Sequence, residues 1–537
     1  METHWSRRKF LEFLGHSSTG LMATSFLPAT LLASCSAMKN RLPTLTPSQE
    51  DDLVLLEGFQ YSILLEEGTI LKDGAEFFGT ENDFLTYFPL SSKNRNDGIL
   101  WSNHESFRPI LLHKMKQSAN RTIEQVRLEQ KNVGGSLVRI KKNHSKQKWE
   151  YLPNSIYNRR LDAQTPIPFA WHEPIFGSKA AIGTLANCAG GTTPWETVLS
   201  CEENYFLYYG EIDYSSGKRV IDHSNNILNW SQYFNYPPEH YGWVVEINPK
   251  TGHAKKLVAL GRFSHEGATS TLGKDGRAAV YMGDDAEGQC VYKFIADQKG
   301  SVETGTLYVA NLEKGQWISL DRNSNEKLKN RFSSQTDLLI RTREAAQLVG
   351  GTPLGRPEDI EINPINQEVL ISLTSTKVNG KKMGSLLKIS EKNKDPLSLE
   401  FQSSTFLSGG DRFANPDNLI FDHSGNLWMC SDISGSKLNQ GDYTRFGNNG
   451  LFFTPMHGAQ AGEVFQVASA PNEAEFTGPC FSPDGKTLFL SVQHPGDESK
   501  TIHALTSHWP KGGTEIPRSA VIALSGPLLE KCVNYRG

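Results

Sequence analysis

Four residues with metal-ligand chemistry stand together in this sequence. Cys201, Glu202, Glu203 and Asn204 follow a short strand-like run in the stretch GGTTPWETVLSCEENYF, residues 190–206. A thiolate suits iron or zinc, whereas carboxylate and amide oxygens suit Ca²⁺. Two interpretations are open for this stretch alone: a site with soft and hard ligands, or an exposed acidic turn beside a buried cysteine.

Polar and acidic tips of the same kind recur along the chain. Each stands at the end of an apolar run and is followed by a turn and a further run. The tips are Asn103/Glu105, Cys201/Glu202/Glu203, His265/Glu266 with Asp284/Asp285 beside it, Arg356/Glu358/Asp359, Asn415/Asp417, and a last copy from Thr477 that contributes His494. Such repetition is typical of a β-propeller, in which each copy is one blade of about four strands. We therefore predict an all-β fold, a six-bladed β-propeller with inserted loops and a few short helices.

Insertions are expected because the tips are further apart than the roughly 40 to 50 residues of an ordinary blade. Three polar segments, 108–130, 213–240 and 311–346, are interpreted as insertions that cover one face of the propeller. With 537 residues, 38% of them hydrophobic, the chain can bury a large core. No Pro- or Gly-rich linker divides it, so we expect a single domain over residues 50–537.

The N-terminus carries export signals. The run SRRKFL at residues 6–11 resembles the twin-arginine pattern, and an interrupted apolar stretch follows it. The text LLASC, which ends at Cys35, resembles a lipobox with Cys35 as the lipidated residue. We expect residues 1–35 to be a signal read by the twin-arginine export machinery. The mature protein is then periplasmic or held at the cell envelope by a lipid on Cys35, or it is a soluble periplasmic protein cleaved near Ala33 or Ala37.

Composition excludes some partners. A net charge of −4 without a basic stretch in the mature chain argues against nucleic acid. No later stretch reaches the length of a membrane span, so membrane contact is expected only through the lipid anchor. We expect a monomer.

The tips should meet at one mouth of the propeller channel. About seven acids and one arginine would then share a dry funnel, where an unpaired charge costs several kcal/mol. Multiple cations are the natural compensation. Asn-Pro-Asp-Asn also forms ordinary turns, so Asp417 is either a turn former or a ligand at this point. His265 is either a ligand or a residue that orients one.

The motifs taken together resemble the PhoX-type alkaline phosphatases, which are exported by the twin-arginine route. The matching text is TPWETVLSCEENY, RFSHEGA, GDDAEGQCVYKF, RPEDIEINP, NPDNL and GPCFSPDGKTLFLSVQHPG, within residues 192–496. The resemblance implies hydrolysis of small-molecule phosphate monoesters by a six-bladed propeller. It also implies a cluster of two Fe³⁺ and about three Ca²⁺ ions joined by an oxo bridge.

Site residues follow from the resemblance and from the tips. The resemblance implies that Cys201 ligates iron, that Glu266, Asp285 and Glu358 ligate ions, and that Arg356 binds phosphoryl oxygens through its guanidinium fork. The full predicted metal set is Glu105, Cys201, Glu202, Glu266, Asp285, Glu358, Asn415 and Asp417, and the predicted catalytic residues are Arg356 and Glu358. Glu196 stands where the family tends to have glycine, and it either crowds the site or faces away.

Two alternatives remain at this stage. One is a calcium-dependent propeller hydrolase, a lactonase or a phosphodiesterase, which has no use for a cysteine ligand. The other is a non-catalytic envelope propeller whose metals stiffen the fold, and it leaves Arg356 beside Glu358 without a role. The residues therefore favour an extracytoplasmic phosphomonoesterase that uses metal-assisted phosphoryl transfer without a nucleophilic side chain.

Overall fold

Many strands of this protein carry apolar side chains on both faces. Strands β26 (Val369–Leu373, VLISL) and β32 (Leu427–Ser431, LWMCS) are buried along their whole length. A strand has this pattern when both faces of its sheet are covered, because the side chains on both faces are then removed from water. In a computed structural model of the chain, β26 and β32 belong to two of six antiparallel sheets, which have four or five strands each.

The structure describes residues 41–536, apart from 75 and 117–119. By its internal contacts the chain divides into two units, Met1–Pro43 and Thr44–Gly537. The second unit holds all six sheets. The predicted export signal and lipobox, including Cys35, lie outside the described residues. Within the described part of the chain, no helix combines the length and apolar content needed to cross a membrane.

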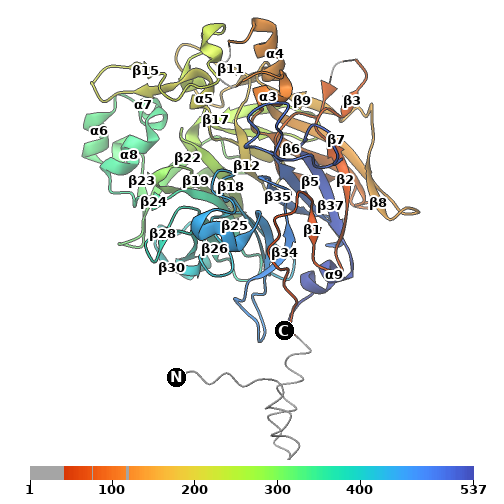
Figure 1. Cartoon of the computed structure of the whole chain (residues 1–537). Helices are drawn as coiled ribbons and strands as arrows, with labels where there is room; N and C mark the ends of the chain where they lie inside the picture. The colour runs from red at the N-terminus through yellow and green to blue at the C-terminus, as the bar shows by residue number, and fades with distance from the viewer. Residues whose placement is uncertain (1–40, 75, 117–119, 537) are drawn as a thin grey trace, which may run out of the picture. The chain divides into compact units, whose positions relative to one another are not determined.

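Each of the six sheets is one blade of a six-bladed β-propeller, as predicted (Figure 1). The innermost strands, which number the blades 1 to 6 in chain order, are β5 (Asn82–Pro89), β12 (Asn187–Thr192), β18 (His265–Leu272), β25 (Pro357–Ile362), β31 (Pro416–Phe421) and β35 (Glu475–Phe481). The second strands are β6 (Asp97–His104), β13 (Val198–Glu202), β19 (Arg277–Asp284), β26, β32 and β36 (Leu488–Gln493).

Further strands complete each blade outward. The third strands are β7 (Gly134–Asn143), β16 (Val244–Ile247), β21 (Val291–Lys299), β29 (Ser385–Glu391), β33 (Gly450–Thr454) and β37 (Ala520–Ser525). The outer strands are β8 (Lys148–Tyr151) and β9 (Arg159–Leu161), β17 (Ala254–Leu257), β22 (Gly305–Asn311) and β23 (Gln316–Ser319), β30 (Phe401–Ser408), and β34 (Phe465–Ser469).

The two ends of the second unit close the propeller together. Strand β2 (Gln60–Glu66) pairs with β37 and becomes the outer strand of blade 6, while β1 (Val54–Leu55) pairs with β34 at the edge of blade 5. Each inner strand also packs against the next, and β35 packs against β5. The ring is thus closed by residues that lie far apart in the sequence, which leaves no open edge between the first and last blades.

Most of the α-helices lie in or next to the inserted segments. Helices α3 (Pro109–Leu112) and α4 (Ile123–Asn132) lie in the first predicted insertion, and α6 (Glu326–Arg331), α7 (Gln335–Ile340) and α8 (Thr342–Leu348) lie in or next to the third. Helix α5 (Phe206–Tyr209) precedes the second, and α9 (Pro527–Val533) ends the chain. Short strand pairs are β3 (Ile70–Lys72) with β4 (Glu76–Phe77), β10 (Pro166–Pro168) with β11 (Ala180–Ile182), β14 (Glu211–Asp213) with β15 (Val220–Asp222), β20 (Glu287–Gln289) with β24 (Leu354–Gly355), and β27 (Lys377–Val378) with β28 (Lys381–Lys382).

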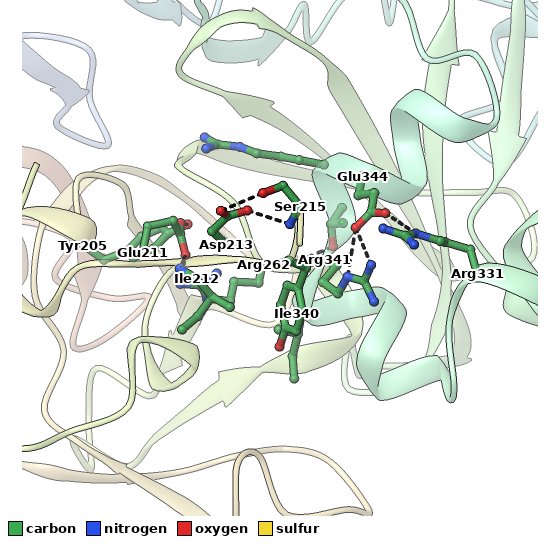
Figure 2. Close-up of a pocket in the computed structure, with 13 residues that line it drawn as sticks. Tyr205, Glu211, Ile212, Asp213, Ser215, Arg262, Arg331, Ile340, Arg341 and Glu344 are labelled. Atoms are coloured by element: carbon green, nitrogen blue, oxygen red, sulfur yellow. Dashed lines mark hydrogen bonds and ion pairs between the residues drawn. The ribbon is translucent and has the colours of Figure 1, made fainter. Parts of the chain in front are cut away.

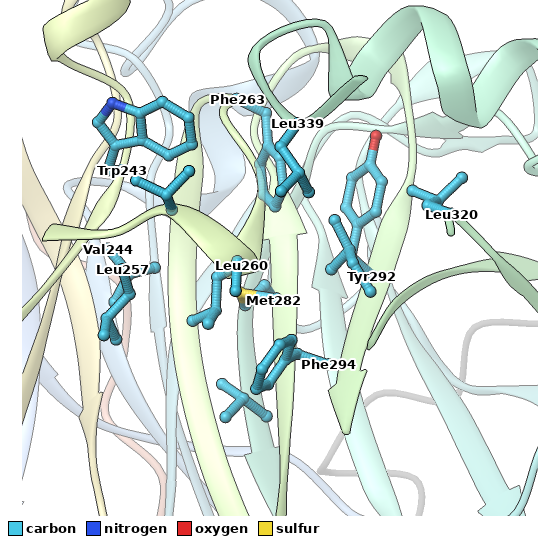
Figure 3. Close-up of a cluster of buried hydrophobic side chains, with 14 of the residues drawn as sticks. Trp243, Val244, Leu257, Leu260, Phe263, Met282, Tyr292, Phe294, Leu320 and Leu339 are labelled. Carbon is cyan, nitrogen blue, oxygen red and sulfur yellow. The ribbon is translucent and has the colours of Figure 1, made fainter. Parts of the chain in front are cut away.

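Hydrophobic clusters between neighbouring blades form the core. In the cluster between blades 2 and 3, Trp243 and Val244 from one blade pack with Met282 and Phe294 from the other (Figure 3). Leu339 of α7 belongs to the same cluster, so the helical insertion is anchored to the propeller by apolar contacts. The blades are therefore held face to face by burial of apolar surface, and the funnel can be lined with polar groups.

Strand β2 allows a test of ring closure. Leu65 is 1% exposed and packs in the cluster between blades 6 and 1, whereas Ile63 of the same strand is 40% exposed. We expect Leu65→Ala to lower the free energy of unfolding by about 2–5 kcal/mol, because it leaves a cavity in the closing strand. Ile63→Ala is the matched control and should change it by less than about 0.5 kcal/mol. Urea unfolding measures both, and equal losses would contradict a closing role for the buried face of β2.

Candidate active site

The inner strands share a sequence pattern at their beginning. Five of them carry an acid or a thiol as second residue, and the sixth begins with an acid. These residues are Asp83, Cys188, Glu266, Glu358, Asp417 and Glu475, and all six line one cavity of about 370 Å³. We call them the inner ring.

A second set of cavity residues comes from the second strands. In five blades, the residue that directly follows the second strand lines the same cavity. These residues are Glu105, Glu203, Asp285, Asp432 and His494, and we call them the outer ring. In blade 4 this position is Thr374, and that blade contributes Arg356, which directly precedes β25. With Asp497, the lining holds ten carboxylates, together with Cys188, His494 and Arg356.

Backbone conformation directs the inner ring into the cavity. In five blades the residue two positions before the inner-ring residue has a positive φ: Glu81 (46°), Ala186 (51°), Arg356 (51°), Asn415 (48°) and Glu473 (61°). A left-handed conformation at a residue other than glycine costs about 1–3 kcal/mol and persists only where the surrounding structure enforces it. The repeated kink is therefore a built feature of the strand entry in these blades.

The thiol lies between carboxylates of neighbouring blades. Cys188 Sγ lies 3.2 Å from Asp83 Oδ2 and 3.3 Å from Glu266 Oε1. Three groups of potential ligand atoms lie within 4.8 Å of one another: Asp83, Glu105 and Cys188; Cys188, Glu203 and Glu266; and Glu266, Glu358 and Asp417. Cys188 and Glu266 each belong to two groups, so the three potential cation sites are contiguous.

Burial and mutual repulsion oppose ionisation in this cavity. Burial, and then the charge of Glu105, raise the pKa of Asp83 to about 7. Burial and neighbouring carboxylates also raise the pKa of Glu203 and Glu266 well above the ordinary value. Burial likewise raises the pKa of the Cys188 thiol, and the acids around it add to the effect. Without added positive charge, much of the cavity would stay protonated at neutral pH.

Two basic groups are already paired with these acids. The guanidinium of Arg356 donates to both oxygens of Asp285 at 2.8 Å, and Nη2 also lies 2.8 Å from Glu358 Oε1. His494 Nε2 lies 2.8 Å from Glu475 Oε1. Burial opposes a charge on His494, but this carboxylate outweighs it and raises the pKa of the imidazole well above its usual value.

Six of the predicted site residues meet in this cavity. Glu105, Glu266, Asp285, Arg356, Glu358 and Asp417 line it, and so do Glu203 and His494, which were expected at the same mouth. Cys201, Glu202 and Asn415 are not among the lining residues.

The placement of Cys201 corrects the prediction. Cys201 and Leu199 lie two residues apart on β13, so they face the same side of the blade, where both pack in the cluster between blades 2 and 3. The cysteine of the cavity is Cys188, on the inner strand of the same blade. The CEE motif reaches the cavity only with Glu203, the first residue beyond the strand.

Glu202 and Asn415 are held elsewhere. Glu202 is fully buried, lies 2.6 Å from Lys256 Nζ, and accepts hydrogen bonds from the backbone of Gly242 and Trp243. The side-chain amide of Asn415 donates to the carbonyl of Thr374 at 2.8 Å. Glu196 lies in the turn between β12 and β13, with its side chain 66% exposed, so it faces away from the cavity.

Five of the acids and thiols that line the cavity were not expected from the sequence: Asp83, Cys188, Asp432, Glu475 and Asp497. The signal that marks the first two is a dipeptide at the strand start, Asn82-Asp83 and Asn187-Cys188, which parallels His265-Glu266. For blades 1 and 2, the sequence-based prediction uses the acidic residues at the ends of the second strands, and these belong to the outer ring.

Fold and site together define a class of protein: a β-propeller with an acidic, thiol-containing cavity at one mouth. The chain matches the family described as alkaline phosphatase PhoX over residues 41–496. The solved structure of Pseudomonas fluorescens PhoX, in complex with vanadate, a transition state analogue, is 29% identical, with a TM-score of 0.81. The match covers 91% of this chain and 98% of that one.

Other comparisons add little. A protein of unknown function from Dyadobacter fermentans is 8% identical, with a TM-score of 0.41 over 88% of this chain and 100% of that one. A search of curated proteins found no match. The family match confirms the resemblance noted in the sequence: this chain belongs to the PhoX alkaline phosphatase family and is a phosphatase that acts on phosphate esters.

The raised pKa values make a prediction about pH. In the unfolded chain the pKa of an aspartate is about 3.9, whereas burial raises the pKa of Asp83 in the folded protein to about 7. Between these values the unfolded state loses a proton that the folded state keeps, so the metal-free protein should lose stability as pH rises. Thermal unfolding of chelator-treated protein from pH 4 to pH 8 measures this. Asp83→Asn should flatten part of the slope, and a stability that rises with pH would contradict uncompensated burial.

Proposed function

We propose that this chain is an extracytoplasmic phosphomonoesterase whose cavity holds two Fe³⁺ and about three Ca²⁺ ions. The observation that carries the proposal is a thiol, Cys188, among contiguous carboxylate groups beside Arg356. A thiolate suits iron and carboxylate oxygens suit calcium, so one cavity fits both ions. Such a set of ions would carry about twelve positive charges, comparable to ten carboxylates and one thiolate.

The residues of the three contiguous groups would hold the ions. They are Asp83, Glu105, Cys188, Glu203, Glu266, Glu358 and Asp417. When bound, the ions supply Lewis-acid charge for the phosphoryl oxygens. The inner ring supplies members of all three groups, which favours a cluster over separate single-ion sites.

Arg356 would bind the phosphoryl group of the substrate. Its fork is held in one orientation by Asp285, through two hydrogen bonds of 2.8 Å. The guanidinium side chain is 35% exposed, so it borders solvent while its acceptors are buried. A positioned guanidinium of this kind can bind two oxygens of a phosphate ester and stabilise their charge in the transition state.

Charge makes phosphate binding depend on the cations. A phosphate monoester is an anion, and ten carboxylates would repel it from the cavity. Filling the cavity with cations reverses the sign of this interaction. Substrate binding and ion binding are therefore coupled in the proposed enzyme.

Matched cysteine variants test the proposal. Protein exported by its own route should contain iron and calcium and should hydrolyse p-nitrophenyl phosphate. We expect Cys188→Ala to lose iron and to lose turnover by more than about 100-fold, because a direct ligand is removed. Cys201→Ala is the control and should keep its iron, since Cys201 packs in the apolar core. Elemental analysis with turnover decides the matter, and iron retained in Cys188→Ala or lost in Cys201→Ala would contradict it.

We also propose export by the twin-arginine route and a lipid anchor at Cys35. The support is the text SRRKFL and LLASC near the N-terminus. Fractionation of cells grown with labelled palmitate tests it. The protein should be labelled and membrane-bound, Cys35→Ala should be unlabelled, and replacement of Arg7 and Arg8 by lysine should block export. Unlabelled wild-type protein that is soluble in the periplasm would exclude the anchor, and wild-type protein retained in the cytoplasm would exclude export.

A further inference from the structure

Blade 6 contributes to the cavity in a different way from the other five blades. Each of blades 1 to 5 supplies at least one member of the three contiguous groups of potential ligands, whereas blade 6 supplies none among the described residues. Its ring residues are Glu475 of the inner ring and His494 of the outer ring, and they are paired with each other at 2.8 Å. The cavity wall on blade 6 therefore pairs its own charges and does not extend the potential cation sites.

The ring of His494 is held in one orientation. The residue has a φ of 39°, in the left-handed region that residues other than glycine rarely adopt. Its Nδ1 donates to the carbonyl of Glu473 at 2.9 Å, and the carbonyl of the next residue, Pro495, accepts a hydrogen bond of 3.0 Å from Arg108. Backbone strain of this kind persists only where neighbouring contacts enforce it, and it is concentrated at functional sites. These contacts direct Nε2 towards Glu475.

The imidazole of His494 carries a second proton, on Nε2. Nδ1 already holds a hydrogen, since the carbonyl of Glu473 can only accept, and Nε2 lies 2.8 Å from Glu475 Oε1. Burial opposes the positive charge, but the neighbouring acids outweigh it and raise the pKa of His494 well above its usual value. The acids whose charges act on the ring are Glu81, Asp83, Glu105, Glu475 and Asp497.

This proton can be transferred. The positively charged side chains that line the cavity are Arg356 and His494. A guanidinium does not release its proton in proteins, whereas an imidazolium does. The acids and the thiol of the three groups would be ionised when cations occupy them, because metal ligands bind in their deprotonated form. Of these groups, only the imidazolium of His494 can therefore donate a proton in the loaded cavity.

A phosphate ester creates a need for such a donor. When the bond between phosphorus and the alcohol oxygen breaks, its electron pair stays on that oxygen, which becomes negatively charged. Either a cation or a proton can neutralise this charge. The potential cation sites lie on blades 1 to 5, so an alcohol part that points towards blade 6 would meet His494.

We propose that His494 is the general acid of the phosphatase reaction and protonates the alcohol oxygen as it leaves phosphorus. The proton moves from Nε2 to that oxygen, which gives a neutral alcohol and a neutral imidazole. Water supplies the oxygen of the new bond to phosphorus, and the proton that this water releases restores the imidazolium through solvent. Glu475 keeps the ring charged between turnovers. The assignment rests on the proposed phosphomonoesterase function.

Two esters with different leaving groups test the assignment. p-Nitrophenolate leaves without a proton because its nitro group stabilises the negative charge, whereas the alkoxide of glycerol depends on one. In the metal-loaded protein, His494→Gln should lower kcat/KM for glycerol phosphate about 100-fold relative to kcat/KM for p-nitrophenyl phosphate. This ratio does not depend on the fraction of protein that is folded and loaded. The control is His240→Gln, which should keep the ratio, because His240 is also buried but bonds to the carbonyl of Ile175 and does not line the cavity.

Glu475→Gln tests the same role through its pH dependence. This variant keeps the imidazole but removes the carboxylate that favours its charged form, so the pKa of His494 should fall. A general acid acts only while it is protonated. The ratio should therefore match that of the wild-type protein at low pH and should decline at a lower pH than in the wild type as pH rises. A pair that only stabilises the fold would not shift this profile.

An unchanged ratio in His494→Gln would overturn the assignment, and so would a profile that does not shift in Glu475→Gln. Both results would leave the phosphomonoesterase function in place, since the wild-type protein would still hydrolyse both esters. Wild-type protein that hydrolyses neither ester would contradict that function and the general acid with it.

Discussion

Repulsion between buried carboxylates is the constraint on which this structure depends. Ten of them line a single cavity, and the two rings at the ends of the strands bring nine of these together. The hydrophobic core must hold these carboxylates close together although their charges repel one another. The closed ring of six blades can do so, because each blade packs on two neighbours and the last is completed by β2 from the other end of the unit. Apolar contacts between blades, rather than contacts in the cavity, stabilise the arrangement.

Other buried acids in the same protein show what the cavity lacks. Glu202 is fully buried but lies 2.6 Å from Lys256, and Glu391 is buried beside Lys293 at 2.9 Å. Each has a lysine partner that compensates its charge. Inner-ring acids such as Asp83 and Glu266 are buried to a similar degree without a basic partner of this kind. The difference lies in compensation rather than in burial, and it is why the cavity, and not these other sites, is suited to cations.

The rings also explain how one site combines hard and soft ligands. Both rings consist of acids except at a few positions, and at one of them blade 2 places a cysteine between the acids of blades 1 and 3. An inner-strand position can change from oxygen to sulfur without altering the rest of the blade, because the side chain points into the cavity. In the proposed metal site, single residues on a repeated scaffold would therefore set the preference among ions.

The sequence by itself determined the class of fold and half of the cavity. Alternating runs and turns predicted six blades, and Glu266, Glu358 and Asp417 were found because each stands where an inner strand begins. The motifs also indicated the family, because they are short sequence patterns that can be recognised without knowledge of tertiary contacts. Cys188 was not found, because the dipeptide Asn187-Cys188 by itself does not show whether its strand is the inner strand of the blade or the second one. Which cysteine of blade 2 faces the cavity depends on strand order across the sheet. The opening stretch CEE had the right chemistry, but β13 lies second from the axis, so Cys201 packs between blades and only Glu203 passes beyond the strand. The cavity between residues 211–215 and helices α7 and α8 (Figure 2) was likewise decided by tertiary structure alone, because its walls come from segments that are distant in the chain.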